Sequence, residues 1–269
     1  MSDAENGLPS GLPKSLYATR HGNIAHLRLA RPEKRNALDE TTVLGLETFF
    51  THLPSDVRAV VLTGEGAHFS AGLDLSEVAE AKDPFLGVKH SRIWHRAFEA
   101  IQFGPVPVIT VLHGAVVGGG LELAASTHIR VAERSAYYGL PEGQRGIFLG
   151  GGGSVRISRL IGVPRVQDLM LTGRTLNAEE GHAAGATQYL VEEGQGLELA
   201  MKLAAKAASN TLTTNFAVLH ALPRIFESDP ASGLLTESLM AAIAETGDEA
   251  KQRLKDFLEK RAAKVLRQS

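Results

Sequence analysis

Two glutamates, Glu122 and Glu142, occur within or beside glycine-rich parts of the sequence. Two carboxyl groups in one site can hold a water molecule between them, one accepting a proton from it while the other donates a proton to the substrate. Each glutamate also has a simpler interpretation. A glutamate near a helix start commonly stabilises that terminus, and Glu142 alone could be a solvated loop residue. The residue types therefore indicate acid–base chemistry only if other features bring the two glutamates together.

Three glycine-rich segments accompany these glutamates, at residues 67–75, 113–122 and 146–154. The first two follow apolar runs that are typical of strands. Glycines at a strand-to-helix turn expose backbone N–H groups, and a helix N-terminus adds its positive dipole end. Two such turns facing each other could donate two hydrogen bonds to one developing oxyanion. For any single segment, a tight turn or close helix packing explains the glycines equally well.

The glycine-rich segments do not match the patterns of other common sites. A dinucleotide-binding pattern needs glycine at its sixth position, where Leu123 and Val155 stand, and the lysine of a phosphate-binding P-loop is missing as well. Ser70 and Ser154 each lack one of the two glycines that flank the nucleophile of a serine hydrolase. A serine hydrolase that uses Ser70 remains an alternative, whose test is a covalent acyl adduct.

Alternating strand and helix patterns must position these groups. Short apolar and β-branched runs predict the strands, and longer periodic runs predict the helices. The predicted strands are 24–29, 59–62, 106–112 and 129–132, and the predicted helices are 39–52, 84–102, 197–209 and 248–266. Asp39 is placed to cap the first of these helices. Strands that alternate with helices indicate an α/β core.

The composition changes at about Gly196, after which alanine, leucine, lysine and glutamate dominate and strand patterns disappear. We therefore predict a flexible polar tail over residues 1–15, a core domain over 16–196 and a helical region over 197–269. The last predicted helix carries a single apolar stripe. Such a stripe must be buried against the chain's own core or against a neighbouring subunit.

Bulk composition excludes several classes of protein. The chain has 269 residues, a net charge of -2 and no cysteine, so disulfides, cysteine-ligated zinc and a cysteine nucleophile are excluded. The near-zero charge argues against a nucleic-acid partner, and the histidines show no metal-binding spacing. No apolar run approaches the ~20 residues that span a bilayer, and the N-terminus does not resemble a signal peptide. We expect a soluble, cytoplasmic protein without a metal.

Six motifs in their order resemble those of the enoyl-CoA hydratase/isomerase superfamily, also called the crotonase family. The resemblance extends from about Leu16 over nearly the whole chain. The motifs are residues 31–38 (RPEKRNAL), 69–75 (FSAGLDL), 118–122 (GGGLE), 139–142 (GLPE), 152–154 (GGS) and 256–261 (DFLEKR). Each is weakly specific alone, but six with the family's gaps are highly specific. The resemblance implies an α/β spiral of strand-strand-helix turns, with a C-terminal helical region that supports trimers, often paired into hexamers.

The resemblance also implies the roles of individual residues. By motif match, the backbone N–H groups of Leu73 and Gly119 form an oxyanion hole for a thioester carbonyl. Glu122 and Glu142 match the positions of the two catalytic glutamates of hydratases. The implied reaction is the reversible addition of water to an enoyl-CoA, with coenzyme A as part of the substrate and no separate cofactor. A double-bond isomerase, another acyl-CoA lyase or hydrolase, and a non-catalytic acyl-CoA-binding subunit remain alternatives.

Contacts with coenzyme A are likewise implied by motif match. The carbonyl of Ala71 would face the adenine, Arg35 would contact the phosphates, and Phe257 and Lys260 would reach the coenzyme A of an adjacent subunit. The full set implied to bind the CoA thioester is Arg35, Ser70, Ala71, Gly72, Leu73, Asp74, Gly119, Phe257 and Lys260.

Four positions depart from the common family pattern. His128 stands where an aspartate is common, Gln144 and Arg145 replace residues that are usually apolar, and Leu149 stands where a proline often precedes the glycine run. We expect these departures to cluster near the acyl pocket and to affect the choice of substrate more than the mechanism. Arg145 could recognise a polar or carboxylated acyl tail, although a solvated surface arginine is the simpler interpretation.

Overall fold

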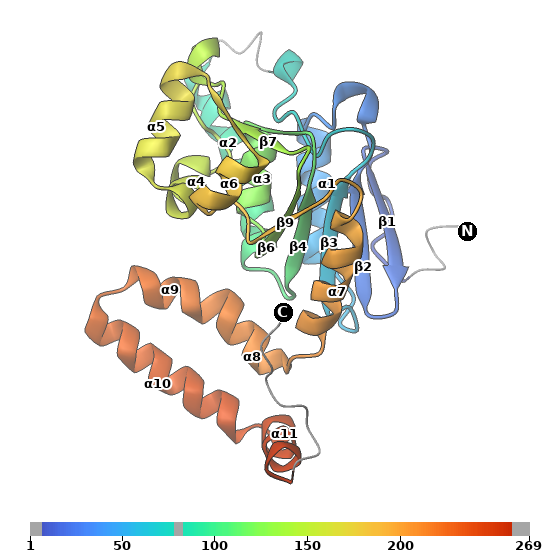
Figure 1. Ribbon diagram of the computed structural model, residues 1–269, viewed down its shortest axis with the longest axis vertical. Coiled ribbons are helices and arrows are strands. Elements are labelled where there is room, and N and C mark those ends of the chain that lie inside the picture. Colours follow the sequence, from blue (N-terminus) through green and yellow to red (C-terminus); the bar gives the residue numbers. More distant parts are fainter. Residues whose placement is uncertain (1–6, 78–82, 260–269) are drawn as a thin grey trace. The chain divides into compact units, whose positions relative to one another are not determined.

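The computed structural model describes residues 7–77 and 83–259 of the chain. The chain divides into two compact units, Met1–Ala208 and Ser209–Ser269. The first unit is mixed α/β and the second is helical (Figure 1). No helix among the described residues is long and apolar enough to cross a membrane.

The elements observed in the described residues match the predicted strands and helices closely. The strands are β1 (Leu16–His21), β2 (Ile24–Leu29), β3 (Ala59–Gly64), β4 (Val108–Leu112), β5 (Ala115–Val117), β6 (Ile129–Glu133), β7 (Tyr137–Gly139), β8 (Thr175–Asn177) and β9 (Tyr189–Val191). The helices are α1 (Glu40–Thr51), α2 (Pro84–Gln102), α3 (Gly119–Ala125), α4 (Gly153–Ile161), α5 (Val163–Thr172), α6 (Ala178–Ala184), α7 (Gly196–Ala208), α8 (Leu212–Phe216), α9 (Leu222–Glu227), α10 (Pro230–Thr246) and α11 (Asp248–Leu258). Asp39 caps α1 as predicted, because its side chain accepts a hydrogen bond from the Thr42 amide.

The strands of the first unit form two sheets. Within the described residues the larger sheet has the order β1-β2-β3-β4-β6-β9, and the smaller has the order β5-β7-β8. The pairs from β2 to β9 in the larger sheet are parallel, whereas β1 is antiparallel to β2. Parallel neighbours require crossover connections, which the helices provide.

Successive parts of the chain repeat a strand-strand-helix turn. In one turn β4 enters the larger sheet, β5 enters the smaller sheet and α3 follows; in the next, β6 and β7 do the same before α4. Two earlier turns are shorter, since after β2 and β3 the second strand is reduced to isolated bridges, Leu38 to Leu73 and Ser70 to Val116. This repetition confirms the predicted α/β spiral. It also sets the loops after β3 and β4 side by side.

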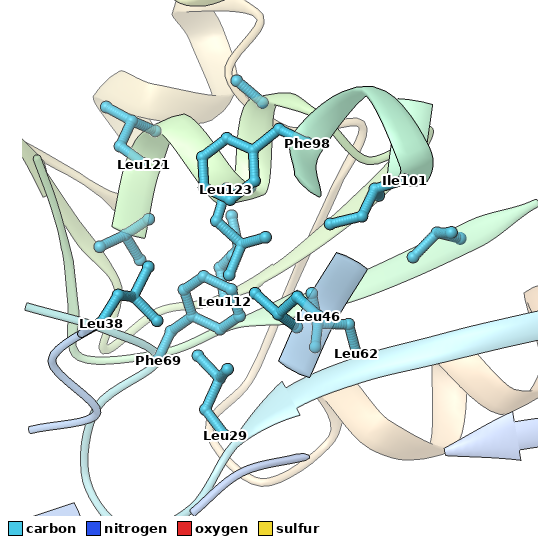
Figure 2. Close-up of a cluster of buried hydrophobic side chains, with 14 of the residues drawn as sticks. Leu29, Leu38, Leu46, Leu62, Phe69, Phe98, Ile101, Leu112, Leu121 and Leu123 are labelled. Carbon is cyan, nitrogen blue, oxygen red and sulfur yellow. The ribbon is translucent and has the colours of Figure 1, made fainter. Parts of the chain in front are cut away.

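The main hydrophobic core lies between the larger sheet and helices α1, α2 and α3. Figure 2 shows Leu29 and Leu62 from the sheet meeting Leu46 of α1, Phe98 of α2 and Leu123 of α3. Side chains alternate along a strand, so the other face of the sheet carries a second cluster. That cluster packs against Ala200, Ala204 and Ala208, which recur every four residues along α7.

The packing of α7 accounts for the observed division of the chain. This helix packs against the second face of the larger sheet, chiefly over β3 and β4, so it belongs to the first unit (Figure 1). The boundary therefore follows Ala208, rather than residue 196 as the change in composition predicts.

Residues 8–15, which precede β1, pack against the rest of the first unit. Leu8 is buried within the main core, and the Pro13 ring lies 2.6 Å from the position that a Cβ on Gly45 of α1 would occupy. Thr42 of α1 also donates a hydrogen bond from its hydroxyl to Ser15. The expectation of a flexible tail over residues 1–15 does not hold for residues 8–15, because Leu8 is buried in the main core and Pro13 and Ser15 contact α1.

The second unit consists of helices alone in its described part. Helices α8 and α9 are joined by one turn of π-helix at Ala217–Ala221, and α10 runs back alongside α9 before α11 (Figure 1). Leucine and isoleucine side chains of α10 are largely exposed, namely Leu234, Leu235, Leu239 and Ile243. The predicted helix over 248–266 is present as far as Leu258, and its predicted end lies outside the described residues.

Candidate active site

The loop after β3 and the turn between β5 and α3 meet at two glycines. Gly72 has a φ of +85°, and a Cβ there would lie 2.5 Å from the Val117 carbonyl oxygen and 2.8 Å from the Gly119 nitrogen. Gly118 has a φ of +53°, another conformation that side chains rarely adopt. The backbones can therefore approach this closely only because both positions lack a side chain.

This approach brings together the amides of Leu73 and Gly119. A Cβ on Gly119 would lie 3.2 Å from the Leu73 nitrogen. Gly119 begins α3, where no preceding helical carbonyl is available. Among the hydrogen bonds of the described residues, neither amide donates to a protein acceptor. Both residues line the same cavity, so the two N–H groups are neighbouring donors at one site.

Glu122 lies in the first turn of α3 and is buried. Its Oε1 accepts hydrogen bonds from the amides of Gly151, at 2.9 Å, and Gly153, at 2.8 Å. Burial raises the pKa of Glu122 to about 7, and the nearby Glu142 carboxyl adds to the rise. The two amides and the Arg156 guanidinium act in the opposite direction by stabilising the carboxylate.

Glu142 is also buried and precedes a 3-10 turn, Gly143–Arg145, that follows β7. Its Oε1 lies 2.7 Å from where a Cβ on Gly118 would be. Its Oε2 is buried with no hydrogen-bond partner among the described residues. Burial raises the pKa of the Glu142 carboxyl, while its own backbone amide and the charge of Arg145 lower it. This glutamate therefore has an acceptor oxygen that the protein leaves available.

Both glutamates and both amides line one cavity of about 180 Å³. Its lining residues come from the loop after β3, from the start of α3 and the glycine before it, from α2, and from the segment between β7 and α4. They are Ala71, Leu73, Leu75, Gly87, His90, Ser91, Trp94, Gly118, Gly119, Glu122, Glu142, Arg145, Ile147, Phe148, Gly150 and Gly151. The arrangement is a mostly apolar pocket with two carboxyls and two amide donors, which suits acid–base chemistry on a polarised carbonyl.

Helix α2 forms one wall of the cavity with residues that were not among the predicted site residues. Gly87, His90, Ser91 and Trp94 all line the cavity. Positions 87, 90, 91 and 94 follow one another at steps of three, one and three, which places them on one face of a helix, so the signal was present in the sequence. Trp94 is only 3% exposed, which makes it part of both the core and the pocket wall.

Ser70 is not arranged as a nucleophile. The residue is fully buried, its hydroxyl donates to the Asn36 carbonyl at 2.7 Å, and its oxygen accepts from the Gly72 amide at 3.1 Å. The nearby His68 uses Nδ1 to accept from the Ala115 amide. These contacts shape the loop around Gly72 and argue against the serine-hydrolase alternative.

The other residues expected to contact coenzyme A are distributed differently. Ala71 lines the cavity, and its amide donates to the carbonyl of the exposed Arg35. The Asp74 carboxylate forms ion pairs with Arg31 at 3.0 Å and Lys34 at 3.1 Å. It also accepts from Ser76. These bonds hold the pKa of Asp74 well below its usual range, so the structure gives Asp74 a role in bracing the loop.

Two expected contacts belong to the C-terminal part of the chain. Phe257 lies exposed on α11 in the second unit. Lys260 falls outside the described residues. Their contact with coenzyme A stays a prediction.

The four departures from the family pattern do not cluster at the pocket. Only Arg145 lines the cavity. Gln144 donates to the Leu171 carbonyl and Leu149 is buried in the core. His128 instead joins β4 to the end of α2, since its Nδ1 accepts from the Val108 amide. Gln144 and Leu149 are chain neighbours of lining residues but do not line the cavity themselves, so among the four departures only Arg145 can touch a ligand there. No group of histidine, aspartate and glutamate in the described part of the chain could hold a metal ion.

Known proteins resemble this chain in sequence and in structure. The family model for enoyl-CoA hydratase/isomerase matches residues 19–267. The chain is 31% identical to the short-chain-enoyl-CoA hydratase of Clostridium acetobutylicum, over 90% of this chain and 94% of that protein. It is 32% identical to the cyclohexa-1,5-dienecarbonyl-CoA hydratase of Thauera aromatica, over 93% and 96%. A crystal structure from Rhodopseudomonas palustris, described as a "putative enoyl-CoA hydratase", is 53% identical with a TM-score of 0.89 and covers 93% of this chain and 97% of that one.

The titration of Glu122 is directly measurable. In protein labelled with carbon-13 at the glutamate carboxyls, one resonance should titrate with a midpoint near 7, because burial disfavours the ionised form. That resonance should be missing from Glu122→Gln, which identifies it. A midpoint near the ordinary glutamate value of about 4.3 would contradict the described environment.

Proposed function

Because this chain belongs to the enoyl-CoA hydratase/isomerase family, we propose that it adds water reversibly across the α,β double bond of an enoyl-CoA thioester through Glu122, Glu142 and the amides of Leu73 and Gly119. The curated relatives named as hydratases make the chain an enzyme of the hydro-lyase class. The acyl-CoA substrate follows from the same family. Coenzyme A is part of that substrate, and the proposed reaction uses no other cofactor.

One observation carries the proposal. Two buried carboxyls and two amides that find no protein acceptor among the described residues line a single cavity within the first unit. A subunit that only binds acyl-CoA would need the amides but would gain nothing from burying two carboxyls, which is costly for ionisable groups. The carboxyl pair therefore favours a catalytic role over the non-catalytic alternative.

The proposed reaction adds the oxygen of one water molecule to the β-carbon and a proton to the α-carbon. The thioester oxygen accepts hydrogen bonds from the Leu73 and Gly119 amides, which withdraw electrons from the conjugated double bond. The water oxygen bonds to the β-carbon while one glutamate takes a proton from that water. The other glutamate, in its acid form, delivers a proton to the α-carbon. The charge that gathers on the thioester oxygen between these events is stabilised by the same two amides.

This chemistry requires one protonated and one ionised carboxyl near neutral pH. The raised pKa values of Glu122 and Glu142 support that state, because burial and mutual repulsion allow the pair to retain a proton. The two carboxyls titrate as a coupled pair. We therefore expect the rate to fall both when the pair loses its proton at alkaline pH and when both carboxyls are protonated at acid pH.

We also propose that the chain self-associates as a trimer or a pair of trimers. The exposed apolar side chains of α10 and the stripe on α11, where Leu254 and Phe257 are each more than half exposed, support an interface in the second unit. Phe257 and Lys260 would then contribute to the coenzyme A site of a neighbouring subunit.

Replacing either glutamate should reduce turnover strongly. With crotonyl-CoA, Glu122→Gln and Glu142→Gln should each lower kcat by ~10²–10⁴-fold, because a positioned acid or base contributes that much. Loss of the absorbance of the conjugated thioester measures the rate. The exposed Glu193→Gln serves as the matched control and should keep wild-type activity. If only one glutamate matters, a one-carboxylate reaction such as double-bond isomerisation replaces hydration. If the wild type is inert on short, long and aryl enoyl-CoAs, the proposal fails.

The contact at Gly72 should be as sensitive as the glutamates. Gly72→Ala would push its Cβ into the backbone of residues 117–119 and displace a donor, so kcat should fall by ~10²–10³-fold. Gly22→Ala is the control, because Gly22 also has a positive φ of +62° but has nothing within 4 Å of its Cβ position. Equal activity of the two variants would show that the close approach has no role in catalysis.

Self-association is testable by sedimentation. At micromolar concentration the protein should sediment with the mass of a trimer or a hexamer. Leu239→Glu on α10 should lower that mass, because it places a charge on the exposed apolar face. A wild-type protein that sediments as a monomer would contradict the proposal.

A further inference from the structure

The glycine loop that binds Glu122 is itself held by an arginine. Gly151 donates its amide to Glu122 at 2.9 Å and accepts at its carbonyl a hydrogen bond from Nη1 of Arg156 at 3.1 Å. Arg156 lies on α4, the helix that this loop begins. The same residue of the loop is therefore fixed on one side by the arginine and presents its other side to the carboxylate.

Gly152 shows how closely the guanidinium packs on this loop. It has a φ of +95°, and a Cβ there would lie 2.3 Å from Nη1 of Arg156. The position requires glycine for its conformation, and a side chain there would displace the guanidinium from the loop. Glycines 151 and 153 are equally confined, since a Cβ on either would lie within 3.0 Å of an oxygen of Glu122.

Arg156 is in turn anchored to the end of α2. Its Nε donates to Oε1 of Gln102 at 2.6 Å. The carbonyl of Gln102 accepts from Nε2 of His128 at 3.0 Å, and Nδ1 of the same ring accepts from the Val108 amide. Because Nδ1 accepts, the ring proton lies on Nε2. His128, one of the departures from the family pattern, therefore connects the start of β4 to the residue that anchors Arg156.

We propose that Arg156 is the positioning residue of Glu122, holding the 150–153 loop in the geometry that presents two amides to the carboxylate and supplying a positive charge that acts on it. The proposal rests on the proposed function, in which Glu122 is one of the two acid–base groups. Arg156 does not line the cavity, so it acts through the loop and through its charge and does not touch the substrate.

The charges around this network act on Glu122 in known directions. Glu142 faces Glu122 and raises its pKa, whereas Arg156 lowers it. Around Arg156 lie Glu99 and His95 of α2 and Arg159 of α4. Burial lowers the pKa of Arg156 itself, and the carboxylates of Glu99 and Glu122 oppose that effect. Removing Arg156 would therefore leave Glu122 with its burial and its like-charged neighbour but without its cation.

The test compares the titration of Glu122 in matched variants. In Arg156→Met the carbon-13 resonance of the Glu122 carboxyl should titrate about one pH unit higher than in the wild type, the lower end of the effect of a nearby opposite charge. Arg156→Lys keeps the positive charge but loses the pair of guanidinium donors that bind Gln102 and Gly151. Gln102→Leu removes the acceptor of the Arg156 Nε without changing any charge. Both variants should therefore raise the Glu122 midpoint by less than Arg156→Met does. Arg165→Met removes the same charge from the exposed side of α5 and should give no shift.

The pH dependence of kcat gives a second readout. One limb of the profile of kcat against pH should disappear in Glu122→Gln, which assigns that limb to Glu122. In Arg156→Met the same limb should move to higher pH, while KM for crotonyl-CoA changes little. A purely structural role would lower activity or thermal stability without moving that limb. If Arg156→Met does not fold, Arg156→Lys and Gln102→Leu decide the matter in the same way.

The two proposals fail separately. If the Glu122 midpoint is unchanged in the Arg156 and Gln102 variants while the wild type hydrates crotonyl-CoA, the positioning role is overturned and the proposed function stands. If the midpoint shifts as expected while the wild type is inert on every enoyl-CoA, the proposed function is overturned and the control of Glu122 by Arg156 remains.

Discussion

The close approach of the backbones at Gly72 and Gly118 is the constraint on which the rest of the site depends. A side chain at Gly72 would overlap the Val117 carbonyl and crowd the Gly119 nitrogen. Without one, two successive turns of the spiral bring their amides together. Since amides in a folded backbone cannot rotate freely, the donors are oriented before any ligand arrives, which is the condition under which they stabilise a developing charge most effectively.

The two buried carboxyls, the acid–base pair of the proposed reaction, are placed by the same loops and by their neighbours. Glu122 follows Gly119 by less than one turn of α3, so the element that supplies a donor also supplies a carboxyl. Burial raises the pKa of both glutamates, and the amides of the glycine loop and Arg156 limit the rise for Glu122. Burial favours the protonated carboxyl, whereas the amide donors and the arginine favour the carboxylate. Because these two effects on the pKa oppose each other, both forms of the carboxyl can be populated near neutral pH.

Local features of the fold and site were predictable from sequence, and long-range contacts were not. Periodicity gave β2 to the residue and located α2 within residues 84–102, and the cap at Asp39 followed from one side chain and the turn after it. The position of Glu122 at a helix start was equally local. Contacts between distant segments leave no periodic pattern in the sequence and could not be predicted. Examples are the bonds from Gly151 and Gly153 to Glu122, the bond from Arg156 to Gln102, and the packing of Leu8. His128 illustrates the limit: its departure from the family pattern was visible, but its role between β4 and α2 was not.

The most direct test of the account follows both parts of the added water. Crotonyl-CoA would be incubated with the enzyme in water labelled with oxygen-18 and, separately, in deuterium oxide, and the products analysed by mass spectrometry and NMR. Hydration by the glutamate pair predicts 3-hydroxybutyryl-CoA with one labelled oxygen on the β-carbon and one deuterium on the α-carbon. Deuterium exchange without oxygen incorporation, or labelled oxygen in a free acid with release of coenzyme A, would contradict it.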